Sequence, residues 1–197
     1  MLISPMEIID IIVMSVLVGI IFSDFFKVPS AVREKYEPLT SDYRLKKRSI
    51  FGINKQGFIS ALLVTAPAIV LHEMGHKFSA LAFGLSAVFH ADYMWLMLGV
   101  ILKFLHFPFL IFVPGYVEIS GGTYLQNAIT SFAGPAVNLI LWLAPLLAVR
   151  KGWVNKRRIP FFIVTSRINM FLFIFNMLPI PPFDGFNFII NLWRAIF

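Results

Sequence analysis

His72 and His76 enclose the sequence HEMGH, and these residue types at this spacing could bind a metal ion. Residues four apart share one face of an α-helix, so both imidazoles can reach one ion. Glu73 follows the first histidine, and a carboxylate at this position can act as a general base toward water that the metal activates. The motif lies in the apolar run Phe58–Phe83. It therefore predicts a hydrolytic zinc centre on a membrane-embedded helix.

A catalytic zinc ion usually has three protein ligands and one open position. The chain has no cysteine, so the third ligand must be His, Asp or Glu. Asp184 follows an apolar stretch without a nearby basic residue, and an unpaired carboxylate at membrane depth is costly. Asp184 is the predicted third ligand, and a protonated or water-solvated Asp at a helix end is the alternative. Glu118 is the next candidate, whereas His90 is expected to be an interfacial histidine.

The elements that position these residues must be membrane helices. The 197 residues are 58% hydrophobic and 14% charged, whereas soluble domains are about 25% charged. We expect one membrane-embedded domain over residues 1–197, with a catalytic core at about 58–185 and no separate soluble domain. The localisation expected is that of an integral, multi-pass protein of the cell membrane, with the lipid bilayer as a partner.

The net charge of +7 is unevenly distributed along the chain. Eight of the 17 Lys and Arg residues fall between Lys27 and Lys55, and five more between Arg150 and Arg158. Such clusters between apolar segments indicate loops on the cytoplasmic side and attraction to anionic lipid. They lack the interleaved aromatic residues of a nucleic-acid stacking surface, so no nucleic-acid partner is expected.

Four apolar runs predict transmembrane helices. The first is expected to be a retained helix rather than a signal peptide, because it has no basic region before it and no cleavage site after it. Residues 27–57 are expected to form a loop, and residues 186–197 are too short to span a bilayer alone. The predicted helices cover residues 8–22, 58–83, 127–149 and 159–178.

The segment Trp95–Val113 is apolar but is interrupted by glycine, charged residues and proline. Alternating residues predict short strands at Ser86–Tyr93 and Tyr116–Ser120. If both basic loops lie on one side of the membrane, HEMGH and Asp184 reach the same depth only when Trp95–Val113 makes no net crossing. The expected fold is thus an all-α membrane protein, a polytopic bundle of about four transmembrane helices with a re-entrant segment and short edge β-strands near the active site.

Two further stretches combine polar residues with a disrupted or closely packed backbone. Gly134 and Pro135 precede Asn138, which is expected either to hydrogen-bond another helix or to contact substrate. Asn176 precedes three prolines in four residues and then Asp184. Such irregular backbone at membrane depth is tolerated where it is buried in protein or lines a cavity.

HEMGH, Gly-Pro-x-x-Asn and Asn-x-x-Pro-x-Pro-x-x-Asp-Gly, in this order in three apolar segments, resemble the site-2 protease family of intramembrane zinc metalloproteases. The form resembles a small prokaryotic member of that family, of archaeal type. The resemblance implies one Zn²⁺ per chain, bound by His72, His76 and Asp184, with Glu73 as catalytic base. It also implies that Asn138 or Asn176 helps to bind a transmembrane protein substrate, and that one of the two strands pairs with that substrate.

Two other function classes compete with proteolysis. A metal-ion or proton transporter also uses His and Asp in membrane helices, but it has no need of a base beside one ligand. A non-catalytic relative would not need every expected catalytic residue. Two arguments about the orientation of the protein in the membrane disagree, so the orientation is left open. The charge rule places the motifs nearer the outside, and the family resemblance places them nearer the cytosol.

Overall fold

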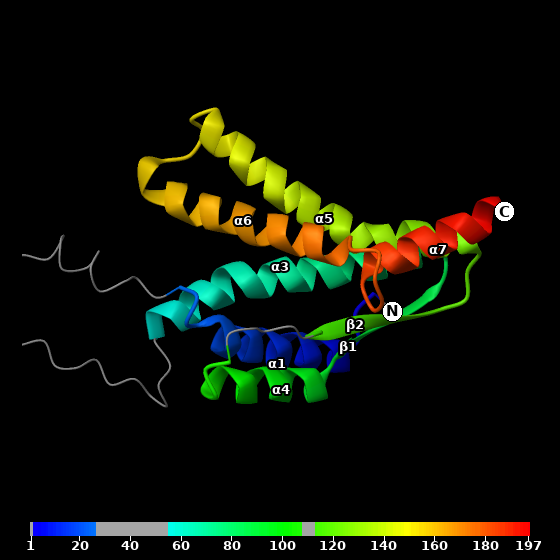
Figure 1. The fold of residues 1–197 in the computed structure, drawn as a ribbon, viewed down its shortest axis with the longest axis horizontal. Coiled ribbons are helices and arrows are strands. Elements are labelled where there is room, and N and C mark those ends of the chain that lie inside the picture. Colours follow the sequence, from blue (N-terminus) through cyan, green and yellow to red (C-terminus); the bar gives the residue numbers. More distant parts are fainter. Residues whose placement is uncertain (1, 27–54, 108–112) are drawn as a thin grey trace, which may run out of the picture.

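The computed structural model describes residues 2–26, 55–107 and 113–197. Four of its helices are long and apolar enough to cross a membrane (Figure 1). They are α1 (Pro5–Phe22), α3 (Lys55–Ala82), α5 (Tyr124–Arg150) and α6 (Ile159–Asn176), the last preceded by the short helix η1 (Lys156–Arg158). The prediction of an all-α membrane protein with about four transmembrane helices is confirmed.

Three of these four helices, α1, α3 and α5, begin three residues before the apolar runs that predicted them, whereas α6 begins where it was predicted. The α1 helix begins at Pro5 because Ser4 and Glu7 form a capping box, in which each side chain accepts a hydrogen bond from the other residue's backbone N–H. The α3 helix begins at Lys55, so the prediction of a loop through Gly57 is wrong for its last three residues. The rest of that predicted loop, residues 27–54, lies outside the described residues.

The strands β1 (Ser86–Ala91) and β2 (Gly115–Ser120) form a two-stranded antiparallel sheet. Ala91 lies opposite Gly115, and the Asp92 N–H donates to the Pro114 carbonyl at 3.1 Å. The segment between the strands includes the 12-residue helix α4 (Tyr93–Phe104) and thus begins and ends at the same place. Both ends of the segment therefore lie together, as the predicted re-entrant path of Trp95–Val113 requires, and its path through a membrane stays a prediction.

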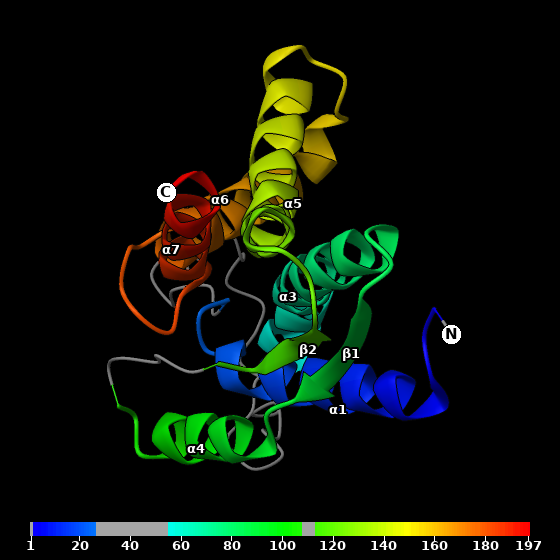
Figure 2. The same ribbon diagram turned by 90° about the vertical axis from the view of Figure 1, so that its right-hand side faces the viewer.

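The α3 helix lies at the centre of the bundle, between α1 and the sheet on one side and α5 with α6 on the other (Figure 2). Buried apolar side chains of α1 and α3 join those of β1 and α4 in one core, with Met14, Met74, Phe89 and Leu96 among them. The connection from α5 to α6 lies at the same end of the bundle as the start of α3 (Figure 1). The second half of α3 therefore points away from that end, toward the sheet and the final helix α7 (Asp184–Ile196).

Candidate metal centre

Both histidines of HEMGH lie on the inner face of α3. His72 and His76 are 6% and 7% exposed, and their ring centroids are 4.8 Å apart. This burial follows from their position: a spacing of four residues puts both rings on one helical face, and that face packs against α5. The two Nε2 atoms lie 3.1 Å apart and face the same space.

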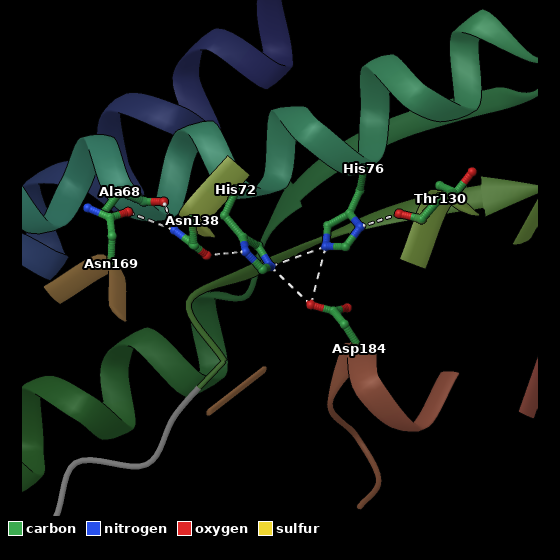
Figure 3. A network of polar contacts seen from close by, with 7 residues as sticks. All are labelled: Ala68, His72, His76, Thr130, Asn138, Asn169 and Asp184. Atoms are coloured by element: carbon green, nitrogen blue, oxygen red, sulfur yellow. Dashed lines mark hydrogen bonds and ion pairs between the residues drawn. The ribbon is translucent and has the colours of Figure 1, made fainter. Parts of the chain in front are cut away.

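Asp184 is the first residue of α7 and completes the cluster from 108 residues farther along the chain than His76. One of its carboxylate oxygens lies 3.0 Å from the Nε2 atom of His72 and 3.4 Å from that of His76 (Figure 3). The structure therefore brings together the three residues that the sequence indicated as ligands, with all ligand atoms within 4.8 Å of one another.

The hydrogen bonds on the far side of each ring select the tautomer that a metal site requires. His72 Nδ1–H donates to the Asn138 side-chain oxygen at 2.6 Å, and His76 Nδ1–H donates to the Thr130 carbonyl at 2.8 Å. Each Nε2 atom then carries a lone pair and faces the lone pairs of Asp184. Three electron-pair donors that converge in this way fit a cation between them.

The separations between these donors also fit zinc. Ligand atoms about 2.0–2.1 Å from a tetrahedral zinc ion lie about 3.3 Å from one another. The three separations of 3.0, 3.1 and 3.4 Å between the His72, His76 and Asp184 atoms are close to this value. Nitrogen and carboxylate oxygen are common zinc ligands, so the donor set is chemically suitable as well.

The antiparallel packing of α3 against α5 explains the spacing in Gly-Pro-x-x-Asn. Gly134 lies opposite His76, and a Cβ atom at position 134 would collide with that imidazole. Asn138, four residues later, lies opposite His72. The four-residue spacing of the glycine and the asparagine on α5 therefore matches the four-residue spacing of the histidines on α3.

Asn138 is completely buried and its amide is fully engaged (Figure 3). Besides accepting from His72, it donates to the Ala68 carbonyl at 3.2 Å and to the Asn169 side-chain oxygen at 2.9 Å. Of the two roles that the sequence allowed for Asn138, these contacts favour the interhelical one. Asn169 was missed by sequence reasoning, although a polar residue in the apolar run 159–178 was its signal.

Glu73 and Asn176 line a cavity of about 1090 Å³ that also contains the three candidate ligands. The Glu73 side chain is buried and lies within electrostatic reach of His72, His76 and Asp184. Its carboxylate is thus available beside the cluster without being one of the three converging groups. The cavity continues along β2, α6 and α7, which leaves room for a molecule much larger than water.

The two weaker ligand candidates lie elsewhere. His90 and Glu118 come from adjacent strands and approach each other at 3.5 Å, with side chains 40% and 66% exposed. Neither belongs to the cluster of converging groups. Gly185 explains instead how Asp184 is positioned, because its backbone packs directly against Met177 and a Cβ atom would collide with the Met177 carbonyl.

A buried network on the opposite side of α3 was also missed by the sequence reasoning. Glu7 forms an ion pair with Lys77, the residue after His76, and accepts from the Phe89 N–H at 2.8 Å. Lys77 donates to the Ala87 carbonyl at 3.1 Å. Glu7 and Lys77 are 3% and 1% exposed. The sequence did contain a signal for this ion pair, namely a charged residue in each of two apolar segments, Glu7 and Lys77.

Asp10 extends this network by one helical turn. Its carboxylate accepts from the Ala91 N–H at 3.4 Å and from the Tyr93 hydroxyl. The hydrogen bond to Asp10 raises the pKa of the Tyr93 phenol, because it stabilises the protonated form. Together, Glu7 and Asp10 accept from two N–H groups of β1 that point away from β2, those of Phe89 and Ala91.

Comparison with known proteins gives two relatives. The protein named "Putative zinc metalloprotease MJ0611" of Methanocaldococcus jannaschii is 36% identical over 137 residues, which are 65% of this chain and 68% of that protein. The protein named "Putative zinc metalloprotease Rip2" of Mycolicibacterium smegmatis is 30% identical over 147 residues, 66% of this chain and 56% of that protein. No family model matches the chain. No solved structure matches it either.

Proposed function

The chain belongs to the site-2 protease-like family of zinc metalloproteases, and we propose that it hydrolyses a peptide bond within or near a transmembrane segment of a membrane protein. One observation carries the proposal. Two imidazoles and a carboxylate converge beside Glu73, in a large cavity between helices that are long and apolar enough to cross a membrane. A multi-pass location in the cell membrane is part of the same proposal.

Each residue of the centre has a role in this reaction. His72, His76 and Asp184 would hold the zinc ion, which when bound polarises the scissile carbonyl and lowers the pKa of water. Glu73 accepts the proton of the attacking water and delivers it to the leaving nitrogen. Asn138 keeps the His72 ring in its orientation through the hydrogen bond at Nδ1.

The Asn176 amide lines the cavity and is proposed to hydrogen-bond the substrate backbone. Asn138 has less capacity for that role, because its amide already contacts His72, Ala68 and Asn169. The substrate must unwind first, since a helix keeps its carbonyl groups in its own hydrogen bonds. An exposed strand edge beside the centre would stabilise the unwound segment.

The hydrogen-bonding pattern of the sheet supports β2 as that edge. Phe89 and Ala91 direct their N–H groups toward Glu7 and Asp10, away from β2. In an antiparallel pair, the residue opposite one that points outward also points outward. Val117 lies opposite Phe89, so its N–H and C=O face the free edge of β2, and Val117 lines the cavity. The outer edge of β1 is already occupied by α1.

The experiment that tests the proposal compares metal content with cleavage. In detergent, wild type is expected to carry about one zinc per chain, and Asp184→Ala is expected to lose it. Glu73→Gln is expected to keep the zinc and to abolish cleavage of a model transmembrane substrate. Zinc retained without Asp184, or cleavage by Glu73→Gln, would contradict the assigned roles.

The same preparations also test the transporter alternative. In proteoliposomes, zinc or proton flux that His72→Ala abolishes, together with no cleavage of any membrane substrate, would replace the proposal. In the part of the chain that the structure describes, the converging His and Asp groups form one cluster at one depth. A transport pathway would be expected to present ligands at several depths.

A further inference from the structure

Arg167 is a charged residue to which the reaction proposed above gives no role. It lies in the middle of α6, eight residues after Ile159 and nine before Asn176. Its side chain lines the same cavity as the metal centre, among apolar neighbours on α6 such as Val164 and Phe171. Among the residues that the structure describes, none forms a hydrogen bond or ion pair with Arg167. An arginine at membrane depth is costly unless it serves a ligand or a pathway.

A second polar group in this part of the cavity also lacks a partner. Thr65 on α3 is 3% exposed and lines the cavity, and its hydroxyl has no hydrogen-bond partner within the described ranges. The carboxylates that line the cavity are Glu73 and Asp184, which belong to the metal centre. This end of the cavity therefore offers a positive charge and a hydroxyl, and among the described lining residues no carboxylate other than those of the metal centre.

The depth of these groups relative to the centre follows from the helix contacts. Asn169 binds Asn138, and Asn138 binds both Ala68 and His72. Arg167 precedes Asn169 by two residues and so lies on the side of the α5–α6 connection. Thr65 precedes His72 by seven residues, which is about 10 Å along the helix axis. An extended peptide covers that distance in about three residues.

We propose that Arg167, assisted by Thr65, binds the carboxylate of an Asp or Glu side chain in the transmembrane substrate, about three residues from the scissile bond. Arg167 thus determines specificity for substrates that carry an acidic residue on the side of the α5–α6 connection. Arg167 is itself exposed in the structure, and the ion pair would form beside apolar cavity-lining side chains such as Val164 and Phe171, where a charge-assisted hydrogen bond to a carboxylate is favourable. The inference rests on the proposed function, because its ligand is the substrate of that reaction.

A lipid phosphate is a poorer match for the same charge. Arg167 lies about 12 Å along α6 from Ile159, which approaches half of the roughly 30 Å hydrocarbon thickness. A headgroup phosphate would have to move this distance into the hydrocarbon region to contact Arg167. A side-chain carboxylate of a transmembrane segment is already at this depth, and its own cost of burial is relieved by the guanidinium.

The test measures binding rather than cleavage. Fluorescent transmembrane peptides are titrated against zinc-loaded Glu73→Gln in phosphatidylcholine nanodiscs, with a single Asp moved through the segment and an Asn peptide matched to each position. At one or two positions on one flank, the Asp peptide is expected to bind about tenfold more tightly than its Asn match. Arg167→Gln is expected to remove this difference, whereas Arg157→Gln, the same charge change outside the cavity, is expected to retain it.

The outcomes separate this inference from the proposed function. Equal binding of the Asp and Asn peptides by the chain with Arg167 intact would overturn the inference, even if wild type cleaves both. An Asp preference that depends on Arg167, without cleavage by wild type, would support the inference and contradict proteolysis. If the two peptides bind alike and phosphatidylglycerol competes only when Arg167 is present, the ligand is a lipid headgroup and the inference is wrong.

Discussion

At the scale of single residues, the orientation of the His72 imidazole depends on Asn138. The asparagine is itself fixed by Ala68 and Asn169, so a chain of hydrogen bonds connects α6 to a proposed metal ligand on α3. Partners of this kind fix the tautomer and the direction of the ring. We therefore expect Asn138→Leu to leave the fold intact and to weaken zinc binding by roughly 10- to 100-fold.

Competition with a chromogenic chelator measures this change in zinc affinity. Asn176→Leu is the matched control, because Asn176 lines the cavity but makes no hydrogen bond with a candidate ligand in the described structure. It is expected to keep wild-type zinc affinity. Equal zinc affinity of Asn138→Leu and wild type would show that the His72 orientation does not depend on this hydrogen bond.

Much of the residue-level arrangement could be predicted from the sequence because its chemistry is specific. HEMGH is a local pattern, and Asp184 stood out because few carboxylates occur in the apolar segments. The Thr130 carbonyl could not be predicted as the partner of His76, since every residue has a carbonyl and only the packing of α5 selects this one. Asn169 could be noticed as a polar residue in an apolar run, but its pairing with Asn138 could not be predicted, because only the fold brings the two residues together.

At the scale of elements, α1 acts as the cover for the outer edge of β1. Glu7 accepts from Phe89 and pairs with Lys77, and all three are buried. Removing one partner of a buried ion pair leaves the other charge uncompensated, at a cost of about 3–5 kcal/mol. We expect Glu7→Gln to lower the thermal unfolding midpoint, measured in detergent by intrinsic fluorescence.

Two further variants separate the charge from the packing. Glu118→Gln makes the same Glu-to-Gln substitution at a side chain that is 66% exposed. Its thermal unfolding midpoint is expected to equal that of wild type. The double variant Glu7→Gln with Lys77→Met removes both charges and is expected to recover part of the loss, because no unpaired charge remains. A double variant less stable than the sum of the single ones would contradict this reasoning.

The free edge of β2 leads to a prediction about substrate. A proline at Val117 removes an N–H that points away from β1, so the sheet itself should tolerate it. We expect Val117→Pro to keep zinc and to reduce cleavage of a transmembrane substrate by about tenfold or more, since a backbone hydrogen bond to the substrate is lost. Val117→Ala keeps the N–H and should stay near the wild-type rate. Equal rates for the two variants would argue against pairing on β2.

The strands themselves were predictable from alternation, but the choice between their edges was not. That choice depends on Glu7 and Asp10, which lie about 80 residues before the N–H groups that they bind. Nothing near Ser86–Ala91 in the sequence indicates that its outer edge is occupied. Only the packing of α1 against the sheet decides it.

At the scale of the whole molecule, the four helices that are long and apolar enough to span a membrane alternate in direction. The α1 helix begins and α6 ends at the end of the bundle that holds the sheet and α7, whereas the α5–α6 connection lies at the other end (Figure 1). This arrangement requires that the segment between Ala91 and Gly115 makes no net crossing, and the pairing of these two residues supports it. The two chain ends should therefore face one side of the membrane and the α5–α6 connection the other.

The chain is suited to a direct test of this topology because it contains no cysteine. Single cysteines at Leu2, Trp153 and Phe197 replace residues that are 71%, 78% and 85% exposed, so folding should be unaffected. In sealed vesicles of one orientation, a membrane-impermeant maleimide is expected to label positions 2 and 197 together and position 153 only after the membrane is opened, or the reverse. Which of the two patterns occurs decides between the charge rule and the family resemblance for the orientation. Labelling of positions 2 and 153 from the same side would require a different number of crossings, and α4 would then have to span the bilayer.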